Sequence, residues 1–305
     1  MKNFKFYLLA AFAALNLISC NDNDDADEQV SENKVDAYIQ FENVFSDHDF
    51  NLNHDYTSAN NGVLNITALK YMITDITFYG SNGTADYTVP TQESFHIIDA
   101  SCEATDYKYL TGIPDGTYNK ISFRYGVSEE VFELGTEAQG DMLVAANEFG
   151  MNWGWTSGYQ FLKYEGSYAG NAANTFKVHN GSHGSSSTGH GTANKSVTDA
   201  PSRIDNSKLI TLAFSNDADI LVSDNTSPKV HLKIDVANIF NSTNLIDISE
   251  GNIIIDAHKS PKVATNVATM FSVDHIHGTT AVFDIPENEG CGSANPNEET
   301  TEHDH

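Results

Sequence analysis

Basic residues and cysteines are scarce in this chain of 305 residues. Sixteen Lys and Arg face 42 Asp and Glu, which gives a formal net charge of −26 at pH 7. Such a negative field repels the phosphates of nucleic acid and the headgroups of anionic lipid, so we expect no nucleic-acid partner. The same charge suits either a well-solvated surface or the binding of cations.

Familiar catalytic motifs are also missing. The sequence contains no Gly-x-Ser-x-Gly, no His-Glu-x-x-His and no Gly-x-x-x-x-Gly-Lys. Its carboxylates form no recognisable catalytic pair, and we interpret the Glu129-Glu130 doublet as part of a solvated face. We therefore do not expect an enzyme.

No apolar run after the first 20 residues is long enough to cross a membrane. The leader has Lys2 and Lys5, then an apolar run that is shorter than the roughly 20 residues a bilayer requires. It ends in Leu17-Ile18-Ser19-Cys20, which is typical of a lipobox. The alternative is an ordinary secretory signal with a chance cysteine. We predict a signal peptide over residues 1–19 and a lipid on Cys20, which makes this anchor the only membrane contact.

The segments that flank the body are acidic and polar. Residues 20–34 lack large apolar side chains apart from Val30, and residues 287–305 are similar, so neither offers enough burial to offset the entropy of ordering. We predict a tether, one β domain over residues 35–286, and a disordered tail. Beside Cys20 the chain has only Cys102 and Cys291, and in an oxidising compartment these two either form one disulfide or stay free.

Alternation of apolar and polar residues predicts strands along most of this domain. The clearest runs are at 35–41, 121–125 and 230–236, with shorter ones at 95–98, 159–164, 209–214, 220–222 and 253–255. Helical spacing is limited to Val263, Val267 and Met270, and is ambiguous over residues 69–76. Many short strands without long intervening helices favour an all-β fold, an antiparallel β-sandwich with long loops and little helix.

Twelve histidines are the main chemical feature, and most of them cluster in the sequence. Imidazole is a good ligand for copper, zinc and nickel. On an extended segment, His275 and His277 would present both rings on one side of a strand and could chelate a metal ion. A Gly/Ser-rich stretch from His179 to Lys195 carries His183 and His190 and predicts a flexible loop.

Both tryptophans lie in one stretch, from Met151 to Gly166, that reads MNWGWTSGYQFLKYEG. This stretch resembles a signature of the MbnP-like family of exported copper-binding proteins. Other blocks are similar to the family's in the same order. They are LKYMITDI at 69–76, IPDGTYNKISF at 113–123, FKVHNG at 176–181 and MFSVDHIH at 270–277. The resemblance covers about residues 35 to 278.

The resemblance implies a β-sandwich that binds copper through histidines. In some members a partner di-haem enzyme of the MbnH type oxidises a tryptophan to kynurenine, which makes Trp153 and Trp155 the candidates for that modification. His179 is the matching ligand. The family's Phe-x-His near the first strand reads Phe41-Glu42-Asn43 here, so that ligand is absent or replaced by His48 or His54.

We therefore expect a lipid-anchored copper-binding protein of the cell envelope, at the outer membrane on its periplasmic or surface face. It would serve copper acquisition or handling, with His179, His48, His54, His275 and His277 as candidate ligands. A structural or glycan-binding lipoprotein on the same fold is the alternative.

Overall fold

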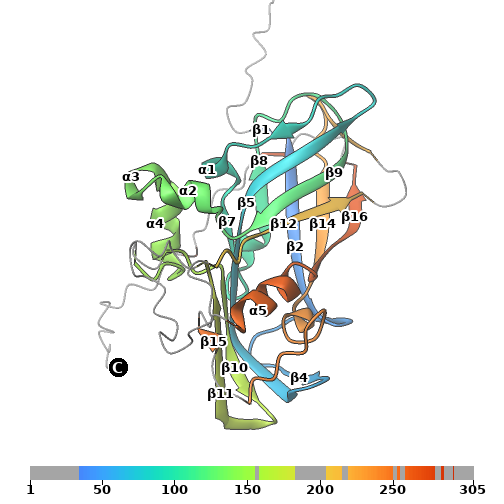
Figure 1. The fold of residues 1–305 in the computed structure, drawn as a ribbon. Helices are drawn as coiled ribbons and strands as arrows, with labels where there is room; N and C mark the ends of the chain where they lie inside the picture. Colours follow the sequence, from blue (N-terminus) through green and yellow to red (C-terminus); the bar gives the residue numbers. More distant parts are fainter. Residues whose placement is uncertain are drawn as a thin grey trace, which may run out of the picture. The chain divides into compact units, whose positions relative to one another are not determined.

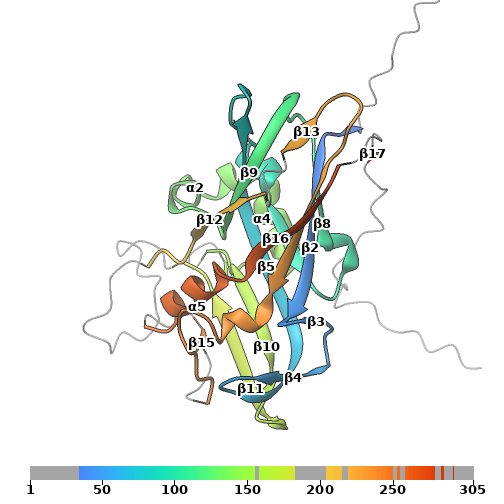
Figure 2. The ribbon, with the colours of Figure 1, turned by 90° about the vertical axis from the view of Figure 1, so that its right-hand side faces the viewer.

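The computed structural model describes residues 34–154, 158–182, 204–214, 219–249, 253–254, 258–278, 283–284 and 291. Two sheets that pack face to face form the body of the described structure, as expected for a β-sandwich (Figures 1 and 2). The ten-stranded sheet has the order β12-β9-β5-β10-β11-β15, with β13 on β9 and with β4, β6 and β7 on β5. The five-stranded sheet has the order β16-β14-β2-β3, with β8 on β2, and a small third sheet joins β1 to β17.

The strands of the ten-stranded sheet are β4 (Asp55–Ser58), β5 (Gly62–Ser81), β6 (Tyr87–Thr88), β7 (His96–Asp99), β9 (Gly116–Tyr125), β10 (Leu162–Tyr168), β11 (Asn171–Asn180), β12 (Lys208–Ala213), β13 (Ile220–Val222) and β15 (Ile253–Ile254). Those of the five-stranded sheet are β2 (Ala37–Phe45), β3 (His48–Asp49), β8 (Tyr107–Leu110), β14 (Lys229–Asp235) and β16 (Phe271–His277). The remaining pair is β1 (Lys34–Val35) and β17 (Phe283–Asp284). Most pairings are antiparallel, and β2–β14 and β11–β15 are parallel.

Helices are short and few among the described residues. The α-helices are α1 (Thr91–Ser94), α2 (Glu129–Glu133), α3 (Thr136–Gln139), α4 (Asp141–Glu148) and α5 (Ser260–Val267). Two 3₁₀ helices, η1 (Glu103–Asp106) and η3 (Val236–Ile239), follow strands. No helix in the described part of the chain has the length and apolar character of a membrane span.

The core lies between the two sheets. Alternation along β2 sends Ala37, Ile39 and Phe41 inward, and all three are buried. Phe271 of β16 closes the sandwich, because its ring packs edge-on against Tyr71 of β5 and Phe123 of β9. The opposite face of the five-stranded sheet carries mainly polar side chains. A candidate site forms on that face.

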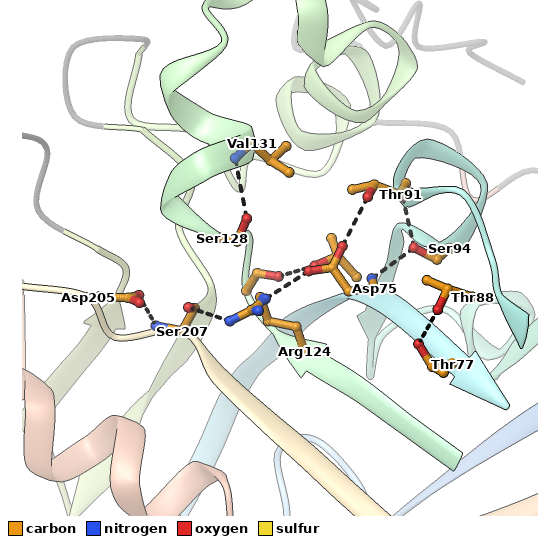
Figure 3. A network of polar contacts seen from close by, with 12 residues as sticks. Asp75, Thr77, Thr88, Thr91, Ser94, Arg124, Ser128, Val131, Asp205 and Ser207 are labelled. Atoms are coloured by element: carbon orange, nitrogen blue, oxygen red, sulfur yellow. Dashed lines mark hydrogen bonds and ion pairs between the residues drawn. The ribbon is translucent and has the colours of Figure 1, made fainter. Parts of the chain in front are cut away.

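Strand β5 pairs with β10 through residues 65–71 and with β9 through residues 73–81, and the register with β9 shifts between Thr74 and Thr77. Asp75 sits at this break with a φ of 54°. Its backbone N–H donates to Ser94, and its carboxylate accepts hydrogen bonds from Thr91 and Arg124, as Figure 3 shows. Aspartate tolerates this left-handed conformation better than most residues, and the polar contacts hold the break in place.

The structure confirms the clearest strand and helix predictions. The alternating runs at 35–41, 121–125 and 230–236 lie in β2, β9 and β14, and the helical spacing from Val263 is helix α5. The ambiguous run at 69–76 is strand, within β5. Helices α2 to α4 were not predicted. The sequence signal for α2 was Ser128, whose side chain caps the helix by accepting from the Val131 N–H, followed by Glu129 and Glu130 in the first turn.

A disulfide joins Cys102 to Cys291, with their Cα atoms 6.0 Å apart. Of the two alternatives left open by the sequence, the bonded one is therefore present. Cys291 lies within the predicted tail, so the bond holds at least this residue of the tail against the body. Lys34, the last residue of the predicted tether, lies in strand β1, whereas the rest of the tether, Cys20, the signal peptide and the tail's other residues lie outside the described residues.

Candidate metal-binding sites

His179 lies on β11, where strand alternation separates it from the core. Phe176 and Val178 point inward and are buried, while His179 is on the other face. On the neighbouring strand β10, Lys163 is its register partner, and Glu165 shares the same face. The histidine of the Phe-x-x-His-x-Gly block is thereby placed beside the glutamate of the Glu-Gly block.

Glu165 fixes the orientation of His179. Its Oε1 lies 2.6 Å from the imidazole Nε2. Partial burial lowers the pKa of His179, and the hydrogen bond to Glu165 opposes that shift only in part. The neutral ring then carries its proton on Nε2, facing the carboxylate, and leaves the Nδ1 lone pair as a metal ligand. Among the described residues, Nδ1 has no hydrogen-bond partner.

Trp153 lies beside this histidine, with its ring centroid 6.4 Å from that of His179. Gly181 makes room for the indole: a Cβ there would come within 2.8 Å of Trp153 Cζ3 and 2.4 Å of the Tyr159 carbonyl oxygen. In Phe176-x-x-His179-x-Gly181, the first residue packs in the core, the second contacts Glu165, and the third makes room for the Trp153 indole. Trp155, the other candidate for modification, lies outside the described residues, as do His183 and His190.

A second group of histidines forms on the outer face of the five-stranded sheet. His275 and His277 of β16 point to the same side, as predicted, and their Nε2 atoms are 2.6 Å apart. His231 of β14 is the register partner of His275, and its Nδ1 lies 3.2 Å from His275 Nε2. One ring nitrogen from each of the three lies within 4.8 Å of the other two. The prediction missed His231, because only the pairing of β14 with β16 brings it there.

Two carboxylates flank these three rings. Asp274 Oδ2 lies 2.5 Å from Nδ1 of His275. Glu42 of β2 places Oε2 3.0 Å from Nε2 of His231, a distance suited to an ion pair, yet this nitrogen makes no hydrogen bond with described residues. His231 is only 9% exposed, and burial lowers its pKa while Glu42 acts in the opposite direction. Within the described part of the chain, this buried ring nitrogen thus has Glu42 at ion-pair distance but no hydrogen bond.

His48 and His54 do not join either group. Both line a surface hollow with Asp55 and Tyr56, and the ring of His54 packs edge-on against Tyr56. Within the described part of the chain, they belong to no set of three or more converging metal-capable side chains. Asn43, which stands where the family often has histidine, accepts a hydrogen bond from the Tyr71 hydroxyl between the sheets.

Together, the fold and the sites define an all-β protein that carries histidines with carboxylate partners on its sheet faces. A match to a family model assigns the chain to one family within this class of protein. The MbnP family model matches residues 34–259, and the chain belongs to that family. A solved structure, MbnP from Methylosinus trichosporium, is similar over 68% of this chain and 78% of its own, with 12% identity and a TM-score of 0.41. No curated protein matches the sequence.

Proposed function

We propose that this member of the MbnP family binds a copper ion through His179 and serves copper acquisition or handling in the cell envelope. One observation carries the proposal: His179 is oriented by Glu165 so that its free nitrogen is available beside Trp153. A carboxylate on the outer ring nitrogen is the usual support of a metal-binding histidine. Imidazole nitrogen is in turn a good copper ligand.

Oxidation of Trp153 would change the ligand atoms available at this site. Its indole lies against His179, so an oxidised product such as kynurenine would place a new oxygen and an amine near the metal. That oxidation needs an external oxidant, for which we propose a di-haem partner of the MbnH type. Trp155 is the other candidate. The role proposed here is binding and not catalysis.

The test is copper titration of the full chain with three proteins: wild type, His179→Ala, and His183→Ala/His190→Ala. If a preformed site exists, His179→Ala should cost far more affinity than the double change, because the loop residues can only chelate loosely. Mass spectrometry of tryptic peptides from the native host would show whether Trp153 or Trp155 is modified. Equal, small losses in both variants would favour the structural or glycan-binding alternative.

The cell-envelope location rests on the leader and on Cys20, and is part of the proposal. If Cys20 carries the lipid, Cys20→Ala should abolish processing at that residue and move the protein to the aqueous phase in detergent partitioning. A Ser19→Ala variant, which keeps the cysteine, is the matched control. Membrane fractionation of Cys20→Ala with normal processing would contradict the anchor.

A further inference from the structure

We propose that His231, His275 and His277 form a second metal site, separate from His179, which binds a divalent first-row ion such as Zn²⁺ or Cu²⁺. The three side chains come from adjacent strands β14 and β16 of the five-stranded sheet, whereas His179 belongs to the ten-stranded sheet. Figure 1 shows β16, β14 and β2 running side by side. The site goes beyond the proposed function, which does not require it.

The proton positions on these rings point to a ligand. Asp274 accepts from Nδ1 of His275, so the neutral form of this imidazole has its lone pair on Nε2. That lone pair faces ring nitrogens of both neighbours, at 3.2 Å in His231 and 2.6 Å in His277. Three nitrogens crowded in this way bring lone pairs together, which is unfavourable unless a proton or a cation lies between them.

A metal ion suits this spacing. Zinc–nitrogen bonds of about 2.0–2.1 Å in a tetrahedral site place ligand nitrogens roughly 3.3 Å apart. The His231–His275 pair, at 3.2 Å, already has this separation. The His275–His277 pair is closer, but His277 is exposed at the end of β16, so its ring can swing outward without disturbing the core.

The flanking carboxylates support two of the three rings. Asp274 holds the outer nitrogen of His275, and Glu42 lies beside the outer nitrogen of His231. A buried ring N–H without a partner is costly, and a small movement of the half-exposed Glu42 would satisfy it once the metal holds Nδ1. Neutral imidazoles backed by carboxylates are characteristic of zinc and copper centres. Three protein nitrogens would leave a fourth position open for water.

The test is titration with Zn²⁺ and with Cu²⁺ in a full-length background where His183, His190, His303 and His305 are asparagine. This background removes chelation by histidines of the loop and tail. We expect Asp274→Asn to weaken zinc binding roughly 10- to 100-fold, as loss of a supporting carboxylate does. His277→Ala should cost more, and because this residue is exposed its loss should leave the fold intact. The matched control is His54→Ala, at another exposed position, which should leave zinc binding unchanged.

Two further measurements separate this site from the one at His179. His179→Ala should leave zinc affinity at the three-histidine site unchanged, so failure of either proposal does not entail failure of the other. Electron paramagnetic resonance of bound Cu²⁺ should show coupling to several imidazole nitrogens, reduced in His275→Ala. Unchanged zinc affinity in both His277→Ala and His231→Gln, or an equal loss in His54→Ala, would overturn the proposal.

Discussion

Glu165 Oε1 lies 2.6 Å from His179 Nε2, across the adjacent strands β10 and β11. The two residues belong to different sequence blocks, and the register Lys163↔His179 brings them together. The carboxylate orients the imidazole and raises its basicity, and in the proposed site the other ring nitrogen would bind the copper ion.

The first prediction concerns this pair. Glu165→Gln keeps the side-chain length but removes the charge, so we expect it to weaken copper binding at His179 by roughly 10- to 100-fold. Competition with a chromophoric copper chelator measures the change. Glu137→Gln, on exposed helix α3, is the control and should bind copper as wild type does. Equal affinities in all three proteins would show that the pair plays no part in copper binding.

The second prediction concerns Gly181. A Cβ at this position would lie 2.4 Å from a backbone oxygen and 2.8 Å from the Trp153 ring, so Gly181→Ala should displace the indole. We expect a loss of about 1–3 kcal/mol in the free energy of unfolding, typical of overpacking. Urea denaturation followed by tryptophan fluorescence measures it.

The control for this change is Gly278→Ala. A Cβ there meets no atom within 4 Å, and we expect the stability of this variant to stay close to wild type. Equal stabilities of the two variants would contradict the close contact between Gly181 and the Trp153 ring.

The third prediction concerns the pH dependence of stability. His96 is largely buried, with its ring against that of Phe41 and its Nε2 2.7 Å from the Thr105 carbonyl oxygen, and burial lowers its pKa from 6.5 to about 3. The unfolded chain therefore binds a proton below pH 6.5 that the folded chain does not. Stability from this residue is complete above pH 6.5 and is lost as pH falls toward 3, at up to about 1.4 kcal/mol per pH unit.

Denaturation curves between pH 7 and 4 test this dependence. His96→Gln removes the titrating group, so its stability should fall less steeply with acid than that of wild type, even if it is lower at pH 7. His54→Gln is the control at an exposed position and should keep the wild-type slope. Parallel slopes for wild type and His96→Gln would contradict the assignment.

The fourth prediction concerns the disulfide. Cys102 and Cys291 are separated by 189 residues, so their bond closes a long loop in the unfolded chain. We expect the Cys102→Ser/Cys291→Ser variant to lose about 2–5 kcal/mol in the free energy of unfolding. Thermal melts with and without reductant provide the measurement: reductant should lower the midpoint of wild type and leave that of the variant unchanged. A wild-type midpoint insensitive to complete reduction would show that the bond adds no stability.

The sequence by itself was enough for the fold class and the family. Alternation at 35–41 and 230–236 predicted the strands, because a sheet with one buried face needs apolar residues with a period of two. The ordered blocks around Trp153 and His179 pointed to the MbnP family, and the family model confirms it. Spacing alone also placed His275 and His277 on one face of a strand.

Tertiary structure decided which of these residues meet. His231 lies 44 residues before His275, and nothing local marks it; it joins the cluster because β14 pairs with β16 in a register that sets the two rings opposite each other. Glu42 reaches the same cluster through the parallel pairing of β2 with β14. His48 and His54, close to Glu42 in sequence, stay apart because β2 ends before them. Strand register depends on the packing of the whole sheet, and periodicity along one strand does not contain it.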